Sequence, residues 1–232
     1  MSSFEDVLQA KQQRIDELHR LQSDRTALLV IDMQRGFLEP GAALELASAR
    51  ALIPNISQLI DACRERQVPV IFTEYVYATN VPCLRGDPFG PEHLPARDGE
   101  PMGFGYPSDN CLVPKFAGQG PNSAETVPEL APRDGELVIQ GFTYDKFYGT
   151  PLDLSLRSQG IQYLIMTGIT ADTCVCATLF SAANRDYRVT AVTDAIEAVA
   201  PDLLQACFTI WERKFARLKT TDEVIAELQL AQ

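Results

Sequence analysis

Histidine is scarce in this 232-residue chain, in which His19 and His93 are the two present. This scarcity restricts metal sites and removes most catalytic triads that are built on histidine. There is also no run of about 18 apolar residues, so no segment is predicted to cross a bilayer. Lys and Arg number 20 against 31 Asp and Glu, and the net charge of −11 argues against nucleic acid or an anionic membrane as a partner.

The cysteines form no CxxC pair, although six are present: Cys63, Cys83, Cys111, Cys174, Cys176 and Cys207. Residues 1–22 lack the apolar core of a signal peptide, so reduced thiols and a cytoplasmic location are expected. Apolar residues recur there at roughly helical spacing among charged ones, which predicts an amphipathic helix within residues 1–23. We expect this helix to pack on its own domain, residues 24–232, or on a neighbouring subunit.

Short apolar runs without alternation are typical of strands that are covered on both faces. Such runs predict strands at Thr26–Asp32, Pro69–Tyr75, Glu136–Gln140, Tyr163–Gly168 and Arg188–Asp194, with a weaker one at Phe215–Lys219. Helical patterns separate them at Ser48–Arg66, Thr150–Gln159, Thr173–Asp186 and Pro201–Arg213, and Thr221–Leu230 closes the chain. This alternation predicts an α/β fold: three α-β-α layers around an open, mostly parallel, Rossmann-like sheet of six strands.

One long segment, residues 78–132, interrupts this alternation with many prolines and glycines and no clear period. A connection of this length inside a compact domain is usually a lid or a binding loop. A solvent-facing insertion without a function is the alternative.

Ligands of open parallel sheets bind beyond the carboxyl ends of the strands, so the residues after each strand are the candidates for chemistry. Asp32 closes the first apolar strand, where a buried carboxylate needs a partner. Asp32 is a candidate catalytic group. The alternative is that it caps a helix or forms a hydrogen bond within a loop, because an aspartate at the end of a strand is typical of these roles too.

Cys174 follows the fourth strand, where a turn leads into a helix that is predicted to begin near this residue. The amino-terminal end of a helix would lower the pKa of the thiol and favour the thiolate. The free N–H groups at that end could also hold an oxyanion. Cys174 is therefore a candidate nucleophile, and a buried, inert cysteine is the alternative. Cys176 should point elsewhere and is expected to pack.

Four segments together resemble the isochorismatase-like cysteine hydrolases, in the right order over roughly residues 24–228: Ile31-Asp-Met-Gln34, Phe147-Tyr-Gly-Thr150-x-Leu152, Gly168-Ile-Thr-Ala-Asp-Thr-Cys174-Val-x-x-Thr178 and Tyr187-Arg-Val-x-x-Val-x-Asp194-Ala195. The amide-cleaving branch of this family uses an Asp–Lys–Cys triad. The resemblance implies that Asp32 is the general base and Cys174 the nucleophile. It also implies a cis peptide bond between Ile169 and Thr170, and an oxyanion hole formed by the N–H groups of Thr170 and Cys174.

The family lysine is missing from its expected place. Counting back six residues from Phe147 reaches Gly141, which has no ammonium to offer. Lys146 on the following turn could swing into the space that glycine leaves, and an ammonium there would stabilise a thiolate. Alternatively Lys115 could reach in from the long segment, or the site works without a lysine, or not at all. Lys146 could also be an ordinary solvated surface charge.

The relatives that bind a metal carry an Asp and histidines after the second strand. The corresponding segment here, Thr73–Asn80, holds no histidine, so no metal or other cofactor is expected and nicotinamide is disfavoured as a substrate. The Thr143–Asp153 segment is most similar to the N-carbamoylsarcosine, biuret and ureidoacrylate hydrolases. This similarity implies hydrolysis of the C–N bond of a small linear amide or carbamoyl compound through an acyl-enzyme on Cys174.

Two other functions remain possible interpretations of the sequence. The chain could be a catalytically silent binding or assembly protein, or a vinyl-ether hydrolase that acts on an isochorismate-like acid without using the thiol. A small molecule is the expected partner, and a homodimer or homotetramer is expected by analogy with relatives. Four aromatic residues are candidates for the wall of the substrate pocket, with core packing as the alternative for each: Phe37, Tyr75, Phe142 and Tyr148.

Overall fold

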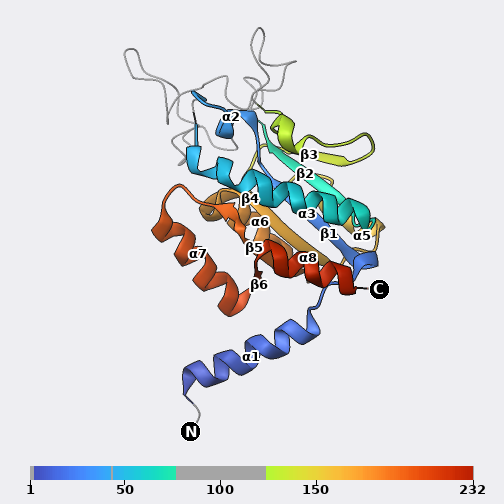
Figure 1. Cartoon of the computed structure of the whole chain (residues 1–232), viewed down its shortest axis with the longest axis vertical. Helices are drawn as coiled ribbons and strands as arrows, with labels where there is room; N and C mark the ends of the chain where they lie inside the picture. The colour runs from blue at the N-terminus through green and yellow to red at the C-terminus, as the bar shows by residue number, and fades with distance from the viewer. Residues whose placement is uncertain (1–2, 43, 77–123, 232) are drawn as a thin grey trace.

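A computed structural model describes residues 3–42, 44–76 and 124–231, and in it the chain forms a six-stranded sheet (Figure 1). The strands lie in the order β3-β2-β1-β4-β5-β6, and every neighbouring pair is parallel. Their bounds are β1 Thr26–Ile31, β2 Val70–Tyr75, β3 Leu137–Gly141, β4 Tyr163–Ile169, β5 Arg188–Glu197 and β6 Ala216–Lys219. The predicted α/β fold with an open parallel sheet is confirmed.

Helices cover both faces of the sheet, which explains why every residue of β1, β2 and β4 is buried. On one face, α3 (Ile53–Glu65) and α8 (Thr221–Leu230) pack side by side over one apolar cluster. On the other face, a second cluster joins the sheet to α5 (Leu152–Ser158), α6 (Cys176–Ala183) and α7 (Pro201–Lys214). Strands with apolar side chains on both faces therefore give the three layers that the sequence predicts.

The strand order reverses at β1, whose neighbours are β2 on one side and β4 on the other. Ile31 at the end of β1 lies opposite Gly168 near the end of β4. Gly168 has φ +108°, and a Cβ at this position would collide with the backbone of Ile31. Glycine is required here for both reasons, and it lets the segments that follow β1 and β4 approach each other.

The region after β4 differs from the prediction of one helix from Thr173 to Asp186. A π-helical turn spans Ala171–Val175, and α6 follows it at Cys176–Ala183. The expected helix at Ser48–Arg66 is likewise divided, into a 3-10 segment at Ala47–Leu52 and α3. A short helix after β1, α2 (Arg35–Leu38), was not predicted, because four residues are too few to show a helical period.

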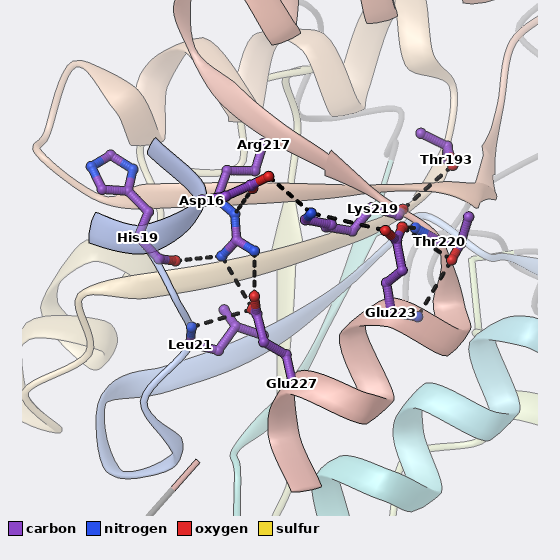
Figure 2. Close-up of polar contacts among 9 residues, drawn as sticks. All are labelled: Asp16, His19, Leu21, Thr193, Arg217, Lys219, Thr220, Glu223 and Glu227. Atoms are coloured by element: carbon purple, nitrogen blue, oxygen red, sulfur yellow. Dashed lines mark hydrogen bonds and ion pairs between the residues drawn. The ribbon is translucent and has the colours of Figure 1, made fainter. Parts of the chain in front are cut away.

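The N-terminal helix α1 (Phe4–Leu18) has no buried residue, and Lys11 on this helix donates a hydrogen bond to the carbonyl of Arg213 on α7. Its carboxyl end is attached through Asp16, which pairs with Arg217 at 2.9 Å and with Lys219 at 3.1 Å, both on β6 (Figure 2). Phe4, Val7 and Leu18 are exposed on this helix. A contact between subunits through α1, and the dimer or tetramer itself, stay predictions.

Residues 77–123 lie outside the described residues. They include most of the long segment that interrupts the alternation, and Lys115 with it. Its last part contains a 3-10 turn at Pro128–Leu130 that leads toward β3. Within the described parts of the chain, none of the helices combines the length and the apolar character needed to span a membrane.

Candidate active site

A buried ion pair lies at the carboxyl end of β1. The Nζ atom of Lys146 lies 2.8 Å from Oδ2 of Asp32, and the two side chains are 0% and 1% exposed. Asp32 has φ +53°, in the left-handed region that a residue other than glycine rarely adopts. Thr73, opposite Ile31 on β2, donates a hydrogen bond to the other carboxylate oxygen of Asp32 at 2.7 Å. Asp32 is therefore held by the neighbouring strand on one side and by an ammonium on the other.

Lys146 reaches this position from the turn after β3, not from the end of the strand. Its Nζ also donates to the carbonyl of Thr143 at 3.2 Å and lies 5.0 Å from the centre of the Tyr75 ring. Gly141 occupies the end of β3, where the family lysine was expected. Of the alternatives left open by the sequence, the structure shows Lys146 beside Asp32 and rules out a solvated surface position for it.

The sulfur of Cys174 is the third member of this group, because its thiol lies within hydrogen-bonding reach of Asp32. Burial raises the pKa of the Cys174 thiol well above its usual value, and the charge of Asp32 raises it further. The ammonium of Lys146 and a hydrogen bond with the Thr173 side chain act in the opposite direction. The pKa of this thiol is therefore shifted in the direction opposite to the lowering predicted from the amino-terminal end of a helix, because desolvation outweighs the ammonium.

The backbone around Cys174 forms the π-helical turn that precedes α6. The carbonyl of Thr170 accepts hydrogen bonds from the N–H groups of Thr173 and Val175, both at 3.1 Å. The N–H of Cys174 lies between these two donors along the chain. The peptide bond between Ile169 and Thr170 is cis, where the resemblance placed it. The use of the Thr170 and Cys174 N–H groups as an oxyanion hole stays a prediction.

The four aromatic candidates occupy different surroundings. Tyr75 is buried, stacks on Tyr144 at 6.0 Å between ring centres, and offers its face to Lys146. Phe37 is half-buried and packs against both apolar clusters. Phe142 and Tyr148 are 42% and 57% exposed. The structure thus places Tyr75 at the ion pair, and the assignment of all four to a substrate pocket stays a prediction.

Two threonines hold the site in place, and the sequence reasoning gave neither of them a role. Thr73 binds Asp32, and the fully buried Thr178 on α6 accepts a hydrogen bond from the N–H of Lys146 at 3.1 Å. Thr178 appears in the family pattern four residues after Cys174, which is one helical turn, and that spacing was the available signal. Thr73 could be found only with the register of β1 against β2.

Gln34, two residues after Asp32, connects three parts of the chain near the site. Its buried amide donates to the carbonyls of Tyr75 and Ala124, both at 2.8 Å, and accepts from the N–H of Tyr75 at 2.8 Å. Glu74 holds the same returning segment by accepting from the N–H of Thr126 at 3.0 Å, and burial raises the pKa of Glu74. The returning end of the long segment is thus fixed beside Asp32.

Metal ligands are not gathered at this site. In residues 3–42, 44–76 and 124–231, no group of three His, Cys, Asp or Glu side chains is arranged to hold a metal ion. The chemistry of this site is that of a carboxylate in contact with a thiol on one side and an ammonium on the other. Such an arrangement can pass a proton from sulfur to carboxylate while the ammonium balances the charge.

Comparisons with known proteins identify the family of this chain. The family model described as the isochorismatase domain matches residues 26–223. The chain is 30% identical over 220 residues to ureidoacrylate amidohydrolase RutB of Pseudomonas savastanoi pv. phaseolicola, covering 88% of this chain and 84% of that protein.

Solved structures show the same fold. A cysteine hydrolase from Pseudomonas syringae pv. phaseolicola superimposes with a TM-score of 0.72 at 24% identity, covering 92% of this chain and 96% of that one. The N-carbamoylsarcosine amidase of Thermoplasma acidophilum gives a TM-score of 0.62 at 26% identity, covering 85% and 97%. The match of the domain model over most of the chain, with the relative at 30% identity, shows that this protein belongs to the isochorismatase family of hydrolases.

Proposed function

We propose that this protein is a cysteine-dependent amidohydrolase that cleaves the C–N bond of a small linear amide or carbamoyl compound. The observation that carries the proposal is the buried Asp32–Lys146 ion pair, 2.8 Å between charged atoms, with the Cys174 thiol beside it. The names of two relatives, a ureidoacrylate amidohydrolase and an N-carbamoylsarcosine amidase, support an amide of this class.

The first step is attack by sulfur on the carbonyl carbon of the amide. The carboxylate of Asp32 takes the proton of the Cys174 thiol as the C–S bond forms, so no free thiolate accumulates beforehand. The N–H groups of Thr170 and Cys174 receive the oxyanion of the tetrahedral intermediate. This order of events suits a thiol whose pKa is raised by burial, because a general base removes its proton during the attack.

The second step expels the nitrogen. Asp32 returns its proton to the leaving nitrogen as the C–N bond breaks, which releases ammonia or an amine and leaves a thioester on Cys174. A water molecule then attacks the thioester while Asp32 accepts one of its protons. The C–S bond breaks, the proton goes back to sulfur, and the acid product departs.

Lys146 keeps the charges balanced through these steps. While Asp32 is ionised, the ammonium compensates a carboxylate that is 1% exposed and would otherwise be costly to bury. When the proton has moved to Asp32, the same ammonium is the positive charge nearest to the developing anion. The carbonyl of Thr143 and the ring of Tyr75 hold the ammonium in place.

The test is ammonia release from a panel of ureides and short carboxamides, including N-carbamoylsarcosine and ureidoacrylate. We expect Cys174→Ala and Asp32→Asn to reduce turnover to the background rate. Cys176→Ala is the matched control, because this thiol lies two residues away in contact with Trp211 and Cys207 and outside the triad. Equal rates for Cys174→Ala and the unmodified protein would overturn the proposal.

The alternatives make different predictions in the same assay. Turnover of an isochorismate-like acid that survives Cys174→Ala would indicate vinyl-ether hydrolysis. Failure of every amide in the panel, together with a folded protein, would favour a binding or assembly role.

A further inference from the structure

The turn that carries Lys146 is fixed to the helix that follows the nucleophile. Thr178 on α6 accepts a hydrogen bond from the backbone N–H of Lys146 at 3.1 Å and donates one to the carbonyl of Tyr144 at 3.3 Å. This side chain is fully buried, so water cannot replace either bond. A single hydroxyl therefore binds the turn on both sides of Asp145.

A second residue of the same helix holds the same turn. Ser181 lies three residues after Thr178, on the same face of α6, and donates a hydrogen bond to Oδ2 of Asp145 at 2.8 Å. The other carboxylate oxygen of Asp145 accepts from the N–H of Phe147 at 2.8 Å. The helix and the turn are thus joined at successive points along one face.

These connections matter because the lysine does not sit on a strand. A residue at the end of β3 would have its backbone fixed by the parallel ladder, in which Gly141 pairs with Tyr75. Lys146 lies five residues further on, outside the sheet, and its backbone is held by the hydroxyls of Thr178 and Thr150. A lysine in this position needs side-chain contacts to place its ammonium.

We propose that Thr178 is a positioning residue for Lys146, and this inference rests on the proposed function. Its hydroxyl holds the backbone of Lys146 where Nζ reaches Asp32. Because Thr178 is one helical turn after Cys174, the same contact fixes the ammonium relative to the sulfur. The lysine of this site is then placed by α6, the helix that directly follows the turn carrying the nucleophile.

The test compares Thr178→Val, which keeps the shape but removes the hydroxyl, with Thr178→Ser, which keeps the hydroxyl. We expect Thr178→Val to lower kcat about 10- to 100-fold with little change in KM, because a small misplacement of a catalytic group is costly. Thr178→Ser should stay within about threefold of the unmodified protein, because both hydrogen bonds remain. Alkylation of Cys174 by iodoacetamide at a fixed pH should slow in Thr178→Val, since the ammonium that favours the thiolate is displaced.

Thr26→Val is the matched control. The buried Thr26 hydroxyl also donates to a backbone carbonyl, that of Gln22 at 2.6 Å, but it lies at the opposite end of β1 from Asp32. It should leave kcat and the alkylation of Cys174 unchanged while lowering the melting temperature to a similar degree. If Thr178→Val does not fold, Thr178→Ala and Thr26→Ala are compared in the same way.

A double mutant separates this inference from the proposed function. In a Lys146→Met background, Thr178→Val should have no further effect on kcat or on alkylation, because the group that it places is gone. An effect of equal size in both backgrounds, or no effect of Thr178→Val alone, overturns the positioning role. If Lys146→Met itself changes neither readout, the role proposed for the lysine and this inference both fall, whereas the amidohydrolase proposal is overturned by an unaffected Cys174→Ala.

Discussion

Two buried cations in this protein have different surroundings. One of them, Arg217, joins three segments as a structural clamp, and the other, Lys146, lies at the candidate active site. Arg217 on β6 has a side chain that is 1% exposed and binds Asp16 of α1 at 2.9 Å and Glu227 of α8 at 3.1 Å (Figure 2). It also donates to the carbonyl of His19. Lys146 is 0% exposed, and its carboxylate partner lies beside a thiol.

The difference lies in what each cation leaves available for chemistry. The planar guanidinium of Arg217 directs its donors at fixed partners from three segments, so it joins α1, β6 and α8. The ammonium of Lys146 is a compact charge, and its neighbours Asp32 and Cys174 can exchange a proton. Burial of an ion pair alone therefore does not point to an active site, whereas burial next to a nucleophile makes the pair a candidate for one.

The largest expected effect comes from removing the cation at the reactive site. Lys146→Met should lower kcat/KM at least about 100-fold, because Asp32 and the transition state lose their countercharge. It should also destabilise the fold by about 3–5 kcal/mol, since a buried carboxylate is left unpaired. Lys219→Met is the control, because that lysine also pairs with an aspartate, at 3.1 Å, but lies on the edge strand β6, two strands from β4. Equal activity of the two variants would contradict the comparison.

The pH dependence of Cys174 alkylation sharpens the picture of the reactive site. Because the pKa of Cys174 is raised in the free protein, the thiolate fraction and the alkylation rate should rise about tenfold per pH unit up to pH ~9. A thiolate held by the helix end would instead give a plateau near neutral pH. The measurement is the rate of iodoacetamide incorporation at residue 174, followed by mass spectrometry. A plateau below pH ~7 would show that the ammonium outweighs burial.

Removing the cation of the clamp, Arg217, should lower the stability of the fold and leave catalysis intact. Arg217→Met should lower the free energy of unfolding by about 2–3 kcal/mol, less than the loss of a fully buried pair, because Asp16 is partly exposed. Helix α1 should then become sensitive to limited proteolysis, while kcat per folded molecule stays the same. Chemical denaturation and steady-state kinetics on the same preparation check this, and a parallel loss of kcat would argue against two separate roles.

The smallest effect is expected at the exposed partner of the clamp. Asp16→Asn should cost about 0.5–1 kcal/mol, since its side chain is 45% exposed and Arg217 keeps its bond to Glu227. A thermal melt against the unmodified protein measures this difference. A loss as large as that of Arg217→Met would mean that Asp16, and not Glu227, dominates the clamp.

The strands and their parallel arrangement could be anticipated from the sequence, because short apolar runs such as Thr26–Ile31 are typical of strands that are covered on both faces. Asp32 and Cys174 were candidates because they follow β1 and β4, whose carboxyl ends meet at the switch point. The parallel pairing of β1 with β4 is enough to bring Asp32 and Cys174 close together. The family relationship was readable from the four motifs, and the match of the domain model confirms it.

Other features depend on contacts that one sequence does not display. The pairing of Lys146 with Asp32 depends on the path of the turn after β3, and the sequence left three explanations open. The raised pKa of Cys174 depends on how completely the π-helical turn is covered, and a helix-end argument misses this desolvation. The Arg217 clamp joins residues some 200 positions apart along the chain, beyond any local pattern.

Gly141 leaves room for a residue that supports Lys146. A Cβ at this position would lie 3.3 Å from Cγ2 of Thr150, whose hydroxyl donates to the carbonyl of Lys146. A lysine at position 141 would thus press on Thr150 and, through it, on the turn that carries Lys146. An amine at the end of β3 and the present path of this turn therefore compete for the same space, and a search for this triad that requires a lysine at the strand end would overlook the one that the turn supplies.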